Sequence, residues 1–177
     1  GMVCAAGLHI PALKGRIQSL VLNDMAPEIA ASAVERIKAY AGQPPAFATV
    51  PELEAFFRVA YAPFGELTDA QWHHLSVTGA KQHADGTWGM SYDPGIANVF
   101  KKGPMQDIDL WPFWDTITCP TLILRGADSD LLLHDTAAEM QKRGPHAKLV
   151  EFAGIGHAPM LMAPDQIKVV TDFLRAP

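Results

Sequence analysis

The chain has 177 residues, of which 49% are hydrophobic and 19% are charged, a composition typical of a globular protein rather than a disordered one. Its 14 lysines and arginines stand against 19 aspartates and glutamates, which gives a formal net charge of −5. Nucleic-acid binding needs clustered cations to replace the phosphate counterions, and no apolar stretch reaches the roughly 18 residues of a membrane span. We therefore expect neither nucleic acid nor a membrane as a partner.

The chain contains two cysteines, Cys4 and Cys119, which are too few for a disulfide scaffold. They favour a reducing compartment, so a cytoplasmic location is predicted. No Cys/His spacing suggests a zinc site, and no cofactor or metal is expected. Residues 1–7 are small and apolar without the basic start of a signal peptide, and we interpret them as part of a buried helix whose earlier turns are missing.

The first predicted element is a strand over residues 16–22, a short apolar run closed by turn residues. Residues 27–111 then predict a mostly helical insert with no clear strand. Its glycine, proline and aspartate content rises late, so residues 79–112 are expected to be rich in loops. Two capping boxes mark the starts of its helices: Thr49 with Glu52, and Thr68 with Gln71.

Strands and helices alternate in the remainder of the chain. Short apolar runs predict strands over residues 121–124 and 147–152. A helix is predicted between them over residues 134–143, because a Gly-Pro pair stops it. A second helix is predicted over residues 164–174. Its expected apolar face consists of Ile167, Val170, Phe173 and Leu174.

This alternation predicts an α/β fold with a parallel sheet, divided into core residues 1–26, an insert over 27–111 and core residues 112–177. Parallel strands need both faces covered, and three strands with the helices available form only a partial sheet. We therefore expect the rest of the sheet to lie upstream of residue 1. An open apolar edge favours association, so the expected partner is a second copy of the chain or the missing N-terminal half.

Two polar loops follow the second and third predicted strands, at residues 125–132 and 154–159. Ligands bind beyond the carboxyl ends of parallel strands, and both loops lie there. An acid on one loop and His157 on the next is the arrangement in which an aspartate orients a histidine base. The glycines beside His157 allow a tight turn that aims the imidazole.

The chain resembles the C-terminal part of an α/β-hydrolase with a helical cap. The resemblance rests on the segments 20–24, 119–126, 128–132 and 154–159 and runs in order along the whole chain. It implies a small-molecule substrate and a nucleophile–His–acid triad. His157 would be the base. Asp130 is the first expected acid because it fits the Ser-Asp-Leu-Leu form of the loop, with Asp24 as the alternative and Asp128 more simply interpreted as a turn residue.

One part of the resemblance is missing, because the chain has no Gly-x-Ser-x-Gly nucleophile elbow around any of its five serines. We therefore expect a hydrolase fragment that is inactive alone. The parent enzyme would act on a small ester-like or carbon–carbon substrate if its nucleophile were serine. With an aspartate nucleophile it would act on an epoxide or a haloalkane. A non-catalytic remnant that serves as a binding or assembly module is the alternative.

Several aromatic residues of the insert are candidates for an apolar substrate pocket, although packing residues of the insert's own core are the more frequent case. The adjacent His73 and His74 point to different sides of a helix and do not have the spacing of a metal pair. The pocket candidates are Phe56, Phe57, Trp72 and Trp88.

Overall fold

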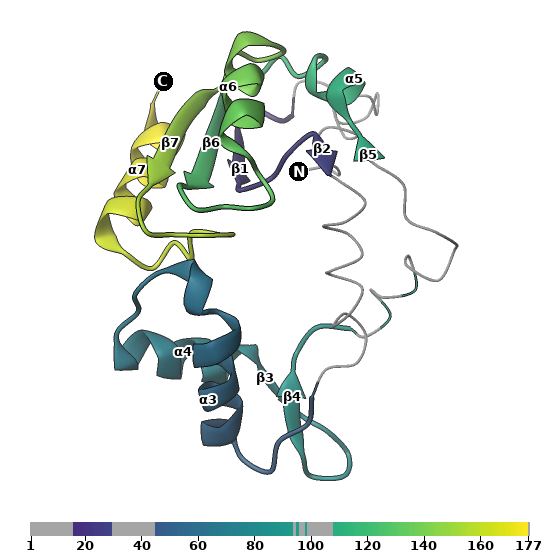
Figure 1. The fold of residues 1–177 in the computed structure, drawn as a ribbon, viewed down its shortest axis with the longest axis vertical. Coiled ribbons are helices and arrows are strands. Elements are labelled where there is room, and N and C mark those ends of the chain that lie inside the picture. Colours follow the sequence, from purple (N-terminus) through teal and green to yellow (C-terminus); the bar gives the residue numbers. More distant parts are fainter. Residues whose placement is uncertain (1–15, 30–44, 94, 96–97, 99–107, 177) are drawn as a thin grey trace. The chain divides into compact units, whose positions relative to one another are not determined.

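The structure is a computed structural model that describes residues 16–29, 45–93, 95, 98 and 108–176 (Figure 1). The helix predicted at the very start of the chain lies outside the described residues. The chain divides into two compact units. Unit 1 contains the described residues of 1–29, 63–65 and 107–177, and unit 2 contains those of 30–62 and 66–106.

Unit 1 is built on a three-stranded parallel sheet with the order β1-β6-β7. The predicted α/β architecture with a parallel sheet is confirmed. The strands and their helices lie within one or two residues of most predicted bounds, although β1 begins only at Leu20. These elements are β1 (Leu20–Asn23), β6 (Thr121–Gly126), α6 (His134–Lys142), β7 (Lys148–Phe152) and α7 (Pro164–Arg175).

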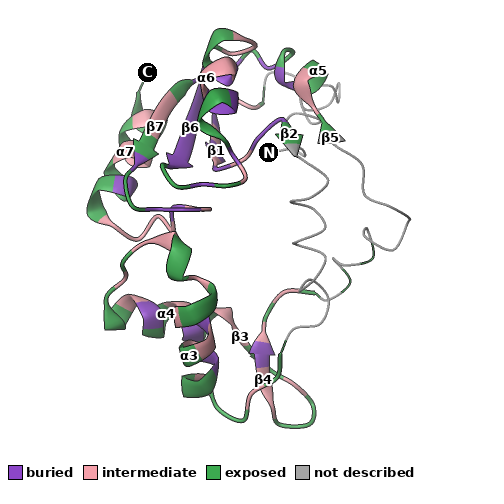
Figure 2. Ribbon diagram, in the orientation of Figure 1, coloured by how far each residue is buried: buried purple, intermediate pink, exposed green. Residues whose placement is uncertain are grey.

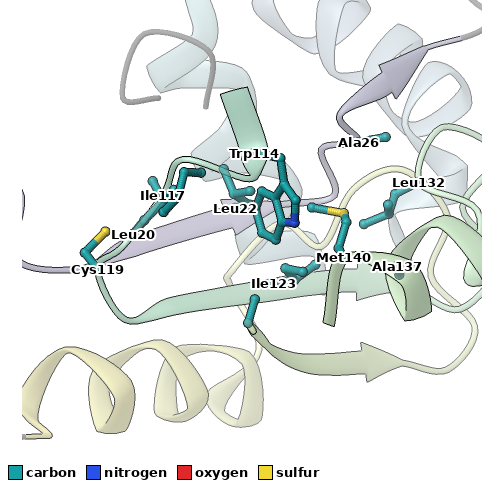
Figure 3. Close-up of a cluster of buried hydrophobic side chains, with 11 residues drawn as sticks. Leu20, Leu22, Ala26, Trp114, Ile117, Cys119, Ile123, Leu132, Ala137 and Met140 are labelled. Carbon is teal, nitrogen blue, oxygen red and sulfur yellow. The ribbon is translucent and has the colours of Figure 1, made fainter. Parts of the chain in front are cut away.

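Each face of this sheet carries its own hydrophobic cluster, because alternate residues of a strand point to opposite faces. On one face Leu22 and Ile123 pack with residues of α6, among them Met140 (Figure 3). On the other face Leu122 and Leu124 pack against side chains of α7. The central strand β6 is buried along its whole length (Figure 2). A strand covered on both faces has the near-continuous apolar sequence that made it predictable.

The helix α7 differs from its expected orientation. Val170 and Phe173 pack against the sheet cluster as predicted, and Val169 joins them. Ile167 and Leu174, however, are 48% and 56% exposed. Their assignment to the buried face is wrong, because the helix turns the side that contains Val169 toward the sheet.

Short elements complete unit 1. β2 (Glu28–Ile29) pairs antiparallel with β5 (Ile108–Asp109), and α5 (Trp111–Trp114) follows directly. The Glu28 carboxylate accepts hydrogen bonds from the Trp111 indole at 2.9 Å and from the Thr136 hydroxyl at 2.8 Å. These two bonds lower the pKa of Glu28. The carboxylate therefore ties α5 and α6 to the chain that leaves β1.

Unit 2 contains two helices around an aromatic cluster, α3 (Val50–Ala60) and α4 (Asp69–Gly79). A 3-10 helix, η2 (Ala62–Phe64), lies between them in the sequence, and its last two residues belong to unit 1. The unit also contains an antiparallel hairpin of β3 (Ala80–Gln82) and β4 (Trp88–Met90), so the prediction of no strand over residues 27–111 is wrong. These strands have only three residues each and lack a β-branched run, which left no strand pattern in the sequence.

Both predicted capping residues begin a helix. Thr68 forms a complete capping box, in which its hydroxyl accepts from the Gln71 N–H and the Gln71 side chain accepts from the Thr68 N–H. Thr49 forms half of one. Its hydroxyl accepts from the Glu52 N–H, but the Glu52 carboxylate accepts from the Ala48 N–H, one residue early.

Candidate active site

The carboxyl ends of β1, β6 and β7 meet at one edge of the unit 1 sheet, because all three strands run parallel. Asp24 follows β1 directly, the loop to α6 follows β6, and the loop that contains His157 follows β7. Three loops distant in sequence are thereby brought together, and each contributes polar side chains to the same edge.

Asp24 is the most buried acid of this edge, with 1% of its surface exposed. Its backbone N–H donates to the Leu124 carbonyl at 2.8 Å, and its Oδ2 accepts from the Gly126 N–H at 3.3 Å. Its φ of 54° is in the left-handed region, which aspartate tolerates better than most residues. The end of β6 therefore holds both the backbone and the side chain of Asp24.

The imidazole of His157 lies beside this carboxylate, with 3.8 Å between His157 Nδ1 and Asp24 Oδ2. His157 Nδ1 and Asp24 Oδ1 are both buried and have no hydrogen-bond partner in the described part of the chain. A buried polar atom without a partner is costly. Both atoms belong to side chains that lie beside each other, so each side chain keeps unused hydrogen-bonding capacity at this place.

Burial raises the pKa of Asp24 above its ordinary value, because the low-polarity surroundings disfavour the charged carboxylate. Hydrogen bonds from Ser129 and from the Gly126 N–H act in the opposite direction, as do the positive charges of His157 and Arg125. Burial therefore disfavours the charged form of the Asp24 carboxylate, and groups from the end of β6 and from the histidine loop partly offset this effect.

The structure brings Asp24 to His157, and it leaves Asp130 exposed on the loop between β6 and α6. The reason lies in the path of that loop. The Ser129 N–H donates to the Gly126 carbonyl at 2.9 Å, so the chain turns back and buries Ser129 in place of its neighbour. Asp130 was our first expectation for the acid, and the geometry favours the alternative. Asp128 is also exposed, as expected of a turn residue.

The histidine loop is fixed to both neighbouring strands. The Ala127 N–H donates to the Phe152 carbonyl and the Asp128 N–H to the Ile155 carbonyl, at 2.8 and 2.9 Å. An added Cβ at Gly126 would overlap the carbonyl oxygens of the histidine loop, so only glycine allows this approach. The loop that contains His157 is thereby locked against the end of β6.

The sequence analysis did not find two residues that act on this site, Asn23 and Ser129. The Asn23 amide donates to the Pro159 carbonyl at 2.9 Å, two residues after His157. Asn23 was interpreted only as a turn residue. The position of Asn23, directly before Asp24 at the end of a strand, was the available signal. Adjacent polar residues at a strand end can both contact a neighbouring loop.

A profile of the alpha/beta hydrolase family matches residues 1–168. The chain belongs to the α/β-hydrolase family. The 3-hydroxybutyrate-oligomer hydrolase of Cupriavidus necator is 42% identical over 168 residues, which are 90% of this chain and 57% of that protein. The chain therefore spans a little more than half of the length of this curated relative.

Two solved hydrolase structures share the fold. An α/β hydrolase from Novosphingobium aromaticivorans is 31% identical with a TM-score of 0.82, over 98% of this chain and 61% of that one. E-2-(acetamidomethylene)succinate hydrolase is 21% identical with a TM-score of 0.75, over 98% of this chain and 62% of that one, a likeness in fold alone.

The four aromatic pocket candidates lie in unit 2, where three of them pack in one cluster. Phe57 and Trp72 are buried at 3% and 6% exposure, and Phe56 and Trp88 are half-buried. Three of the four belong to the cluster between α3 and α4, and the fourth forms a backbone bridge with Phe47. Phe56, Phe57 and Trp72 are therefore part of the core of unit 2. A role of the four candidates toward substrate stays a prediction.

The described residues include no group of three or more His, Cys, Asp or Glu side chains arranged to hold a metal ion. His73 pairs with the Glu54 carboxylate at 3.6 Å, and its neighbour His74 is exposed. Among the same described residues, no helix is long and apolar enough to cross a membrane.

Proposed function

We propose that this chain supplies the acid and the base of an ester hydrolase, with His157 as the base and Asp24 as the acid that orients it. The observation that carries the proposal is the distance of 3.8 Å between His157 Nδ1 and Asp24 Oδ2, in two side chains that each retain a buried polar atom without a partner among the described residues. In such a pair the carboxylate fixes the imidazole tautomer and stabilises the imidazolium that forms when the base takes a proton.

The nucleophile comes from outside these 177 residues. No serine of the chain has the Gly-x-Ser-x-Gly frame, and the chain spans 57% of the length of its relative. In the assembled enzyme His157 would remove the proton of that nucleophile as it attacks the ester carbonyl, and later return the proton to the leaving alcohol. The partner that provides the nucleophile completes the sheet along β1, which has β6 as its neighbour among the described strands.

The substrate class follows from the relative. The Cupriavidus necator protein is a hydrolase of 3-hydroxybutyrate oligomers, and 42% identity over 168 residues is close enough to propose the same ester linkage here. We therefore propose short oligomers of a 3-hydroxy acid as substrates of the complete enzyme. A homodimer of this chain is a separate prediction, for which sedimentation at micromolar concentration is the test.

The experiment fuses the part of the Cupriavidus necator protein that has no counterpart here to the N-terminus of this chain. Release of acid from the 3-hydroxybutyrate dimer is then measured. We expect His157→Gln and Asp24→Asn to lower kcat by about 10³–10⁴-fold. Asp130→Asn is the matched control and should stay within a few-fold of the parent.

The outcomes separate the two assignments. If Asp130→Asn abolishes turnover while Asp24→Asn retains it, the acid is Asp130 and the geometry has been misinterpreted. If a folded and active fusion keeps its rate in His157→Gln, the proposed base is wrong. Circular dichroism of each variant excludes loss of fold as the cause.

A further inference from the structure

Asn23 is the last residue of β1 and stands directly before Asp24. Its Nδ2 donates a hydrogen bond to the Pro159 carbonyl at 2.9 Å. Pro159 is fully buried and lies two residues after His157. The end of β1 therefore contacts the histidine loop at two points, with Asp24 beside the imidazole and Asn23 on the backbone that follows it.

The backbone at Asp24 allows two adjacent residues to reach one loop. In an extended strand, consecutive side chains point to opposite faces of the sheet, so Asn23 and Asp24 would point apart if β1 continued. At Asp24 the φ of 54° takes the chain out of the extended conformation. The left-handed residue that ends β1 thus brings both side chains to the loop after β7.

The bond to Pro159 also determines the orientation of the Asn23 amide. A carbonyl oxygen only accepts hydrogen bonds, so Nδ2 must face Pro159 and Oδ1 must face away from it. Asn23 Oδ1 is buried and has no partner among the described residues. An unpaired buried acceptor costs free energy, so the orientation of this amide favours the bond to the histidine loop over the needs of its own oxygen.

The chain before His157 is held in a different way, by a bond between two backbone groups. The Gly156 N–H donates to the carbonyl of Pro63, which belongs to unit 1 as well, at 2.6 Å. After His157 a side chain has the corresponding role, because the Asn23 amide holds Pro159. A backbone bond does not depend on which side chain is present, whereas the bond to Pro159 depends on the amide of Asn23.

We propose that Asn23 is a positioning residue, which fixes the histidine loop to the end of β1 and so keeps the imidazole of His157 beside the Asp24 carboxylate. This proposal rests on the proposed function, because Asn23 acts through the acid–base pair. Two adjacent residues of one strand end then supply both the acid and the anchor of the base. The pair is thereby arranged within this chain, before the nucleophile is supplied.

The test measures how strongly His157 acts on Asp24 with and without the Asn23 amide. The pKa of the Asp24 carboxyl is titrated by carbon-detected NMR in the intact chain, in the parent, in His157→Gln, in Asn23→Ala and in the double variant. The positive charge of His157 lowers this pKa, so His157→Gln should raise it in the parent. In the Asn23→Ala background we expect less than about half of that rise, because the interaction of two charges weakens as they move apart.

Gln82→Ala is the matched control. The Gln82 amide also donates to a backbone carbonyl, that of Gly86 at 3.2 Å, but it lies in unit 2. The response of Asp24 to His157→Gln should be the same in this background as in the parent. If Asn23→Ala does not fold, Asn23→Leu replaces it, because leucine has a similar branched shape and no hydrogen-bond donor.

An equal rise in the parent and in the folded Asn23 variant would overturn the proposal. An equally reduced rise in Gln82→Ala would overturn it too, because the loss would not be specific to the bond with Pro159. If His157→Gln leaves the Asp24 pKa unchanged in the parent itself, the pairing of Asp24 with His157 is wrong and the role of Asn23 is wrong with it. Failure of the positioning role alone is therefore distinguishable from failure of the proposed function.

Discussion

The two units of the chain differ in how many of their buried polar side-chain atoms have a hydrogen-bond partner. In unit 2 the buried Ser76 hydroxyl donates to the Trp72 carbonyl, and no described side chain of that unit has a buried polar atom without a partner. In the described part of unit 1, five such atoms have no partner. Three of them lie at the carboxyl ends of the parallel strands: Asn23 Oδ1, Asp24 Oδ1 and His157 Nδ1. The buried polar side-chain atoms described in unit 2 have hydrogen-bond partners. Unit 1 keeps buried polar atoms without partners at the end of β1 and in the histidine loop after β7.

This difference indicates that unit 2 is arranged for stability, whereas unit 1 gives up some stability at its candidate site. Unpaired buried groups cost about 1–3 kcal/mol each, and a fold keeps them only where the surrounding structure holds them in place. The β6 end supplies that support through Gly126, Ser129 and Arg125. If so, substitutions at the candidate site of unit 1 should change stability differently from matched substitutions in the core of unit 2.

The largest expected effect distinguishes two glycines, one in each unit. Gly126→Ala should destabilise the chain by roughly 2–4 kcal/mol, because its Cβ would overlap backbone carbonyls that cannot move aside. Gly79→Ala is the matched control in α4. Its Cβ would lie 3.6 Å from the Phe57 ring, an ordinary contact, and alanine favours the helix. Urea unfolding of both variants measures the difference, and equal losses would contradict the tight approach at Gly126.

Asp24→Asn should stabilise the chain at neutral pH by about 0.5–2 kcal/mol while removing its function. Burial raises the pKa of Asp24, so the folded state keeps the proton to higher pH than the unfolded state does. The free energy of unfolding of the parent therefore falls as pH rises from the ordinary aspartate pKa toward the raised one. The advantage of asparagine should vanish below the ordinary aspartate pKa and grow as the pH rises through the raised pKa of Asp24. Asparagine also tolerates the left-handed backbone at this position.

Thermal unfolding from pH 3.5 to 7.5 checks this sign. A variant that is less stable than the parent at pH 7 would show that the charged carboxylate contributes to stability. The description of Asp24 as a strained site residue would then be wrong.

The smallest expected effect compares the two helix caps of unit 2. Thr68→Ala should cost about 1 kcal/mol, because it removes one half of a complete capping box. Thr49→Ala should cost less, roughly 0.5 kcal/mol. The Thr49 hydroxyl forms one hydrogen bond, from the Glu52 N–H, whereas the Thr68 hydroxyl forms two with Gln71, one accepted from its N–H and one donated to its Oε1. Urea unfolding of the two variants gives the ranking, and the reverse order would contradict the geometry of the caps.

The sequence predicted the parts of the fold that local patterns determine. The apolar run of β6 and the capping threonines were recognisable because burial and capping restrict the residues allowed there. The hairpin of unit 2 was missed because its strands are three residues long and do not alternate apolar and polar residues. The Asp85-Gly86 pair at its turn, where Gly86 has a φ of 87°, was the available signal.

The candidate site was predicted in part for a related reason. His157 was recognisable from its glycine frame, but the choice between Asp24 and Asp130 depends on how the β6–α6 loop folds back. That fold-back is determined by hydrogen bonds of Ser129, a residue whose side chain forms no recognisable pattern. The sequence therefore narrowed the acid to a few aspartates, but it did not show which of them lies beside His157.

The central claim is that Asp24 and His157 form one acid–base pair. Its most direct test is the titration of the Asp24 carboxyl by carbon-detected NMR in His157→Gln and, as the control, His134→Gln. The positive charge of His157 lowers the pKa of Asp24, whereas His134 is exposed and pairs with Glu151. The account predicts that the Asp24 pKa rises in His157→Gln and stays unchanged in His134→Gln. An Asp24 pKa that is the same in the parent and in His157→Gln would contradict it.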